Sequence, residues 1–155
     1  MEPKTLLLGE WLLQRKLLTP EKLELALEEQ GLTGDFLGDI LVRKKYIGEK
    51  DLMKALSEQF QIPYLDMRHQ PIDMDLALRF SPALISEHQC LPIRESQTEV
   101  LFAITNPLDA FGVSKAEKEA VPKKLRLTLV TPEDMRSALK KYQQHLAAKR
   151  KRSLQ

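Results

Sequence analysis

The sequence has little of what catalytic and metal-binding sites require. Its six glycines are scattered and form neither a G-x-x-x-x-G-K-[ST] nor a G-x-G-x-x-G phosphate-binding loop. The three histidines, His69, His88 and His145, lie far apart, and none stands at ligand spacing from another histidine. We therefore expect a protein that is not an enzyme and that needs no cofactor or metal. An enzyme of unfamiliar type is the weaker alternative.

Cysteine and long apolar runs are also scarce. Cys90 is the only cysteine, which excludes an internal disulfide and indicates a reducing compartment. It precedes the apolar run Leu91-Pro92-Ile93, so we expect a buried core residue and not a nucleophile. No apolar run approaches the roughly 18 residues that span a bilayer, and the first residues lack the features of a signal peptide. We expect a soluble protein of the cytoplasm.

Acidic residues are missing from the end of the chain. After Asp134 there is none, whereas seven lysines and arginines follow it. Because the whole chain carries only +2, the first 134 residues are net acidic. We expect residues 143–155 to form a basic tail or a linker, with contact to an anionic membrane surface as one use of it. Nucleic-acid binding is not expected, because no aromatic residue follows Tyr142 to stack on bases.

What the sequence does contain is an internal repeat. Residues 7–30 align without a gap on residues 36–59, and nine of the 24 aligned positions are identical. Each copy predicts a helical hairpin with one apolar face. Thr19-Pro20-Glu21 and Gly48 are expected to start the second helix of each hairpin, and Gly31 to end that of the first. The identical pairs include Leu8/Leu37, Gly9/Gly38, Lys16/Lys45, Leu23/Leu52 and Gln30/Gln59.

Glycine early in a helix needs a reason, because it costs about 1 kcal/mol relative to alanine. Gly9 and Gly38 both occupy such a position. They are therefore expected to allow a close approach, either by a neighbouring helix or by a ligand.

From Ile62 onward the pattern changes to mixed α/β. Strands are predicted at 62–65, 90–93, 100–104 and 125–130, the third being central and the proline-containing ones at edges. A helix is predicted after Asn106-Pro107-Leu108-Asp109, and a last one from Thr131 through Tyr142, with Asp134 closing a capping box. We predict an α+β fold in which the pair of hairpins (residues 1–60) packs on a small α/β subdomain (residues 61–142).

The two copies resemble the paired segments of the MshEN family, the N-terminal domain of type II secretion and type IV pilus assembly ATPases. The family pattern, written twice, is R-L-G-x-x-L-V-x-x-G-L-I, a linker, and L-x-x-A-L-x-x-Q. Here L-G-x-x-L begins at Leu8 and at Leu37, and L-x-x-A-L-x-x-Q spans 23–30 and 52–59. The second half is similar at 61–66, 91–93 and 103–109, so the resemblance covers about residues 7–142.

This resemblance implies two functions. Members of the family dock an ATPase to a membrane-anchored platform protein of a secretion or pilus system. That role implies a place at the inner membrane face, with the platform protein or an adjoining ATPase domain as the partner. A subset binds cyclic di-GMP across the two motifs. The residues that match the motifs, and are thus candidates for cyclic di-GMP contacts, are Leu8, Gly9, Lys16, Gln30, Leu37, Gly38, Lys45 and Gln59.

The sequence departs from the family pattern at matching places in both copies. The arginine that opens each motif, which contacts a guanine base in the binding members, is Leu7 in one copy and Phe36 in the other. The glycine before the last apolar pair is replaced by Lys16 and Lys45. We therefore expect docking as the function, with cyclic di-GMP binding as the alternative and the sole tryptophan, Trp11, as a docking anchor or a core residue.

Overall fold

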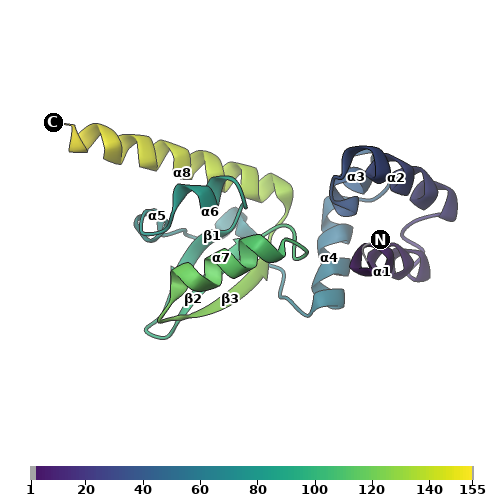
Figure 1. Ribbon diagram of the computed structural model, residues 1–155, viewed down its shortest axis with the longest axis horizontal. Helices are drawn as coiled ribbons and strands as arrows, with labels where there is room; N and C mark the ends of the chain where they lie inside the picture. Colours follow the sequence, from purple (N-terminus) through teal and green to yellow (C-terminus); the bar gives the residue numbers. More distant parts are fainter. Residues whose placement is uncertain (1–2, 155) are drawn as a thin grey trace. The chain divides into compact units, whose positions relative to one another are not determined.

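The computed structural model describes the backbone of residues 3–154 and the side chains of residues 8–68 and 70–154. The chain divides after Ile62 into two compact units. The first contains helices, and the second contains helices and a three-stranded sheet (Figure 1). This content confirms the predicted α+β class.

The first unit is built from the two predicted hairpins. Helix α1 packs against α4 and α2 packs against α3, so the hairpins interleave instead of forming separate modules. Leucine at the aligned positions Leu12 and Leu41, and at Leu52 and Leu56, is completely buried in the shared core. The helices are α1 (Pro3–Gln14), α2 (Pro20–Thr33), α3 (Leu37–Arg43) and α4 (Glu49–Phe60).

The helix starts in this unit are as predicted, but one helix end is not. The Thr19 side chain accepts a hydrogen bond from the backbone N–H of Lys22, and Gly48 is the N-cap of α4. Helix α2 continues past Gly31 and ends at Gly34, which adopts a left-handed φ of 76°. Gly31 was the wrong choice because Gly34 closes the helix through its N–H to the carbonyl of Gln30.

The second unit carries a sheet of order β1-β2-β3, with β1 (Leu91–Glu95), β2 (Glu99–Ile104) and β3 (Lys124–Leu129). β1 and β2 are antiparallel, whereas β2 and β3 are parallel. A parallel pair needs a crossover, and α7 (Ala110–Ala120) supplies it. As predicted, 100–104 lies in the central strand, and Pro92 lies in an edge strand.

One predicted strand is absent from the described sheet. Residues 62–65 make only a single parallel bridge, from Tyr64 to Leu129. Pro63 lacks a backbone N–H and can offer only its carbonyl, which accepts from the N–H of Leu129 and from the hydroxyl of Thr128.

The segment between the first bridge and β1 was not predicted from the sequence. It contains the 3-10 helix η1 (Met67–His69) and two short helices, α5 (Met74–Ala77) and α6 (Pro82–Ser86). Asp73 and Ser81 cap these helices through their side-chain oxygens. The Ser81-Pro82 start has the same form as the Thr19-Pro20 start, so the signal for α6 was present.

The last helix, α8 (Pro132–Ser153), differs from the prediction in two respects. It does not end at Tyr142 but continues through most of the predicted basic tail. Gln143 to Arg152 contain no glycine or proline, and cations in the last turn suit the negative end of the helix dipole. The Asp134 carboxylate also does not close a capping box with Thr131. It accepts a hydrogen bond from the backbone N–H of Met67 instead.

Candidate functional site

Both motif glycines allow close packing of the two helices within their own hairpin. A Cβ at Gly9 would lie 2.9 Å from Cδ1 of Leu23 on α2. A Cβ at Gly38 would lie 3.0 Å from Cδ2 of Leu52 on α4. Leu23 and Leu52 are aligned in the repeat, so the same contact is built twice. The neighbouring helix therefore explains both glycines.

In the second copy the side chain of Phe36 also lies beside the glycine. Phe36 stands where the family pattern has arginine, and its Cε2 would be 2.6 Å from a Cβ on Gly38. The space beside Gly38 is thus already filled by the Phe36 ring. The corresponding residue of the first copy, Leu7, has a side chain outside the described residues.

Lys16 and Lys45 occupy the C′ position just after α1 and α3. Their φ angles are 58° and 61°, in the left-handed region. In the first copy the Lys16 N–H donates to the carbonyl of Leu13, and the Leu17 N–H donates to that of Leu12, both at 3.0 Å. Lys45 and Tyr46 repeat this pair of bonds after α3. These are Schellman motifs, which explains why the family pattern has glycine here.

The remaining motif residues divide into core and polar positions. Leu8 and Leu37 are both 0% exposed, so they belong to the core and offer nothing to a ligand. The Gln30 side chain donates to the backbone carbonyl of Asp35 at 3.0 Å and closes the connection between α2 and α3. Oε1 of Gln59 is buried and has no hydrogen-bond partner among the described residues. Of the eight candidates, only Lys16 and Lys45 are exposed charged groups.

Trp11 is half-buried and covered by a cation. The Arg15 guanidinium lies 4.0 Å from the centroid of the Trp11 ring. Arg15 also pairs with Glu58 on α4, with 3.0 Å between the charged atoms. Nε1 of Trp11 is buried without a hydrogen-bond partner among the described residues. Trp11 is therefore connected to α4 through Arg15, and its ring is partly covered by that side chain.

Ion pairs also join the two hairpins, between α2 and the end of α3. Glu29 on α2 pairs with Arg43 and with Lys44, which follow one another at the end of α3. Hydrogen bonds from Lys44 and then Arg43 lower the pKa of Glu29. Because solvent reaches these ion pairs, they contribute little to the free energy of unfolding. Their main effect is to fix the orientation of α2 on α3.

The outer face of α2 carries two exposed leucines among its acidic residues. Leu25 is 53% exposed and Leu32 is 88% exposed, and they lie two turns apart on the same side as Glu28. The same helix also lines an open hollow of about 420 Å³ between α1 and α2. Its lining consists of three leucines, a proline and two acids: Leu13, Leu23, Leu27, Pro20, Glu24 and Glu28. We call Leu25, Leu32 and this hollow the α2 surface.

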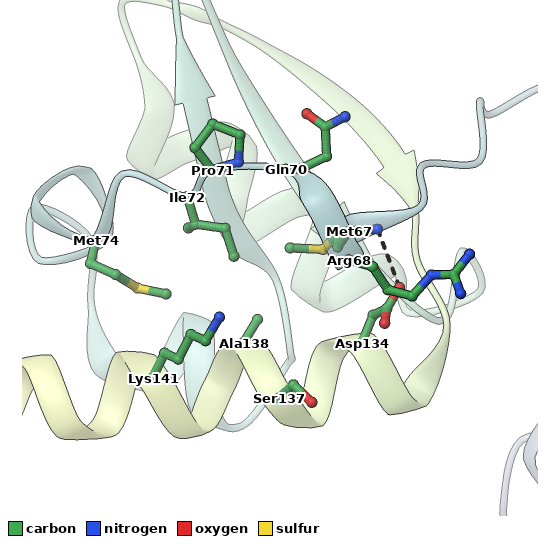
Figure 2. Close-up of a pocket in the computed structure, with 10 residues that line it drawn as sticks. All are labelled: Met67, Arg68, Gln70, Pro71, Ile72, Met74, Asp134, Ser137, Ala138 and Lys141. Atoms are coloured by element: carbon green, nitrogen blue, oxygen red, sulfur yellow. Dashed lines mark hydrogen bonds between the residues drawn. The ribbon is translucent and has the colours of Figure 1, made fainter.

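A second hollow, of about 390 Å³, lies in the α/β unit between α8 and the segment that runs from η1 to α5 (Figure 2). The Asp134 carboxylate holds the segment to α8 at its Met67 end. The apolar lining comes from both walls, and Lys141 of α8 extends into the space between them. We call it the α8 pocket. Sequence reasoning missed it because its two walls are 67 residues apart in the chain.

Cys90, His88 and Asp109 are side chains of the second unit that could take part in chemistry, and each has a structural role. Burial, and next the nearby Asp109 carboxylate, raise the pKa of Cys90 to about 12, so the thiol is protonated and a poor nucleophile, in agreement with the sequence prediction. His88 contacts Asp109, which also caps α7 through the N–H of Gly112. Within the described part of the chain, no cluster of His, Cys, Asp or Glu could hold a metal ion. Nor is any described helix long and apolar enough to cross a membrane.

Comparison with known proteins places this fold in a family. The model of the MshEN domain matches residues 60–149. This match covers nearly the whole second unit, whereas the doubled motif lies outside it. Two type IV pilus assembly ATPases named PilB are similar in sequence. That of Thermus thermophilus is 38% identical over 105 residues, and that of Myxococcus xanthus is 26% identical over 106 residues.

The similar region is a small part of these relatives. It covers 67% and 68% of this chain but only 12% of the Thermus protein and 19% of the Myxococcus protein. The chain therefore spans less than a fifth of the length of the pilus ATPases it matches.

Two solved structures share the fold. The structure of MshE with cdg (cyclic di-GMP) superimposes with a TM-score of 0.76 at 22% identity, covering 87% of this chain and 97% of the other. The N-terminal domain of XpsE gives a TM-score of 0.69, also at 22% identity, over 84% of this chain and 89% of the other. Both coverages are too large for either unit alone, so the helical hairpins belong to the shared fold.

Proposed function

The chain belongs to the MshEN domain family, and on that premise we propose that it is a non-catalytic docking and regulatory module. It links a secretion or pilus ATPase to a membrane platform protein of the same system. Its similarity to two PilB ATPases supports the choice of system. The absence of any phosphate-binding loop from the sequence supports a role without nucleotide hydrolysis.

The observation that carries docking is the α2 surface. Leu25 and Leu32 are large apolar side chains that are more than half exposed. The same helix contributes leucines and two acids to the lining of the hollow, and apolar residues next to charged ones are the composition of an interface centre with a polar edge. The acids Glu24 and Glu28 favour a partner segment that carries apolar residues next to lysine or arginine.

The proposal is tested by titrating the chain with the cytoplasmic domain of a platform protein from the same genome, by calorimetry. The native chain should bind, and a Leu25→Ser, Leu32→Ser variant should bind at least tenfold more weakly, which corresponds to about 1.4 kcal/mol. Val121→Ser is the matched control, because Val121 is also exposed but lies in the second unit. If every candidate platform domain fails to bind the native chain, docking loses its basis.

The end of α8 suggests a place at the inner membrane face. Lys149, Arg150, Lys151 and Arg152 are consecutive, exposed and helical, so they surround the helix axis with positive charge. Each such residue near an anionic bilayer adds about 1 kcal/mol of attraction. We assign this cluster to peripheral contact with anionic lipid while the platform protein is bound.

Cyclic di-GMP binding is the second candidate, and the MshE complex is the observation that favours it. The ligand would meet the two motifs at Leu8, Gly9, Lys16 and Gln30 and at Leu37, Gly38, Lys45 and Gln59. Only Lys16 and Lys45 among them offer free charge to a phosphate. Leu8 and Leu37 are core residues, and Phe36 fills the space beside Gly38. We therefore expect weak binding or none.

A further inference from the structure

A module that links two proteins needs a second contact surface, and we propose that the α8 pocket is that surface. It takes a protein segment in which an aliphatic side chain stands next to a carboxylate. This inference rests on the proposed docking function, because it names a partner segment for a linking module.

The floor and upper wall of the pocket are apolar and adaptable. Met67 and Ala138 form a buried floor, and Ile72 and Met74 are half-buried on the wall that faces α8 (Figure 2). Methionine side chains adjust to the shape of what they contact, which suits a wall that receives a foreign side chain. A pocket of about 390 Å³ has room for an aliphatic side chain and the backbone that carries it.

The pocket contains a cation that has no ion-pair partner among the described residues. Lys141 is exposed and forms no ion pair with any described residue. Figure 2 shows its side chain extending from α8 toward the Ile72 wall. A ligand that reaches the apolar floor therefore passes next to an uncompensated ammonium group.

The nearby acids are already engaged. Asp134 accepts the Met67 N–H, and the Asp66 carboxylate accepts from the Arg68 guanidinium, with the closest pair of atoms 2.6 Å apart. Asp75 contacts His145 at 2.9 Å, and this hydrogen bond lowers the pKa of Asp75. Arg136 and Lys140 add exposed positive charge on the same helix. Asp134 keeps its negative charge because a backbone N–H is neutral, so the attraction for a carboxylate is local to Lys141, which lies two turns of α8 away from Asp134.

The lining also argues against a nucleotide. None of the described side chains that line the α8 pocket is aromatic, so none of them offers a ring on which a base could stack. A single free ammonium with an aliphatic wall fits one carboxylate beside one apolar side chain better than it fits a pair of phosphates.

The test is a selection of short random peptides displayed on phage, with the whole chain as bait. Enriched peptides should be acidic and carry Leu, Ile or Met within one helical turn of Asp or Glu. Their affinity, measured by fluorescence anisotropy, should weaken at least tenfold in Lys141→Glu and in Ile72→Ser. Replacing the acid of the peptide by lysine should restore binding to Lys141→Glu.

Lys140→Glu is the matched control, because it makes the same charge change on α8 outside the pocket lining. It should leave the affinity within about twofold once salt screens distant charges. No enrichment, enrichment of basic peptides, or peptides that bind Lys141→Glu as well as the native chain would overturn the inference. None of these outcomes involves the platform protein, so docking at the α2 surface is judged separately.

Discussion

Lys16 and Lys45 have the same left-handed backbone conformation at equivalent positions of the two hairpins, with φ of 58° and 61°. A residue with a Cβ pays about 1–2 kcal/mol for this conformation, whereas glycine does not. We expect Lys16→Gly and Lys45→Gly each to raise the free energy of unfolding by about 0.5–1 kcal/mol, after the greater entropy of unfolded glycine is subtracted. Urea denaturation measures the gain.

Gln14→Gly serves as the control for this prediction. Gln14 is exposed and is the last residue of α1, with right-handed helical backbone, so glycine there should lower the stability by up to about 1 kcal/mol. A loss of stability in both lysine variants would show that the left-handed conformation is not a source of strain in this protein.

The two motif glycines should respond differently to alanine. At Gly38 the new methyl group meets both the Phe36 ring and the buried Leu52, so we expect a net loss of about 1–2 kcal/mol. At Gly9 the described contact is with the flexible end of Leu23, and the better helix propensity of alanine should nearly cancel the cost. In a Phe36→Ala background the cost of Gly38→Ala should shrink. Equal stability of Gly38→Ala and native protein would contradict this packing.

Cys90 should be inert in the folded protein. A pKa of about 12 leaves almost no thiolate at pH 8, and the side chain is buried. Its reaction with a thiol reagent such as dithionitrobenzoate should be as slow as global unfolding and should accelerate along the urea unfolding curve. Fast labelling in native buffer would mean that the β1 edge opens without unfolding of the unit.

Because both motif arginines are absent, we predict that cyclic di-GMP binds weakly or not at all. A lost bidentate contact to a base costs about 1–3 kcal/mol, so two losses weaken binding by a factor of roughly thirty to many thousands. Calorimetry at near-physiological salt should detect weak binding or none in the native chain. Leu7→Arg, Phe36→Arg should bind more tightly, and this variant also removes the ring beside Gly38. Any residual binding through Lys16 and Lys45 should fade with added salt.

The calorimetric result for the native chain is the one that decides this prediction. Tight binding by the unaltered sequence would make the chain a cyclic di-GMP receptor and would show that exposed lysines at the C′ positions replace the arginines.

Local signals in the sequence predicted the elements that a cap or a periodic apolar pattern defines. Thr19-Pro20 and Thr131-Pro132 each start a helix where expected, and the apolar run 100–104 is the central strand. The repeat correctly indicated two hairpins. It did not reveal that they interleave, because the packing of α1 against α4 is a contact between the two hairpins, which a pattern within each copy does not determine.

Errors arose where two local signals competed. Gly31 and Gly34 are both plausible helix ends, and only the hydrogen bond from Gly34 to Gln30 decides between them. The basic residues after Tyr142 suggested a tail by charge, although alanine, leucine and lysine in that stretch favour a helix. Contacts of Gln143 with Ser86 and of His145 with Asp75 hold the first turns of this extension to α6 and α5.

The candidate surfaces were the least predictable part. The sequence singled out the motif residues correctly as a repeated unit, but burial of Leu8 and Leu37 could not be separated from a ligand contact by pattern alone. The two walls of the α8 pocket are joined by a hydrogen bond between Met67 and Asp134, and no spacing in the sequence predicts this contact. The exposure of Leu32 is likewise a property of how α2 lies on its neighbours.

The most direct test of the account is one calorimetric titration of the chain with its platform domain, performed with and without saturating cyclic di-GMP. The account predicts binding with the same dissociation constant in both conditions, because docking uses the α2 surface and the nucleotide has no strong site. It also predicts that Leu25→Ser, Leu32→Ser weakens binding at least tenfold in both. Binding that requires cyclic di-GMP, or that the leucine variant leaves unchanged, would contradict it.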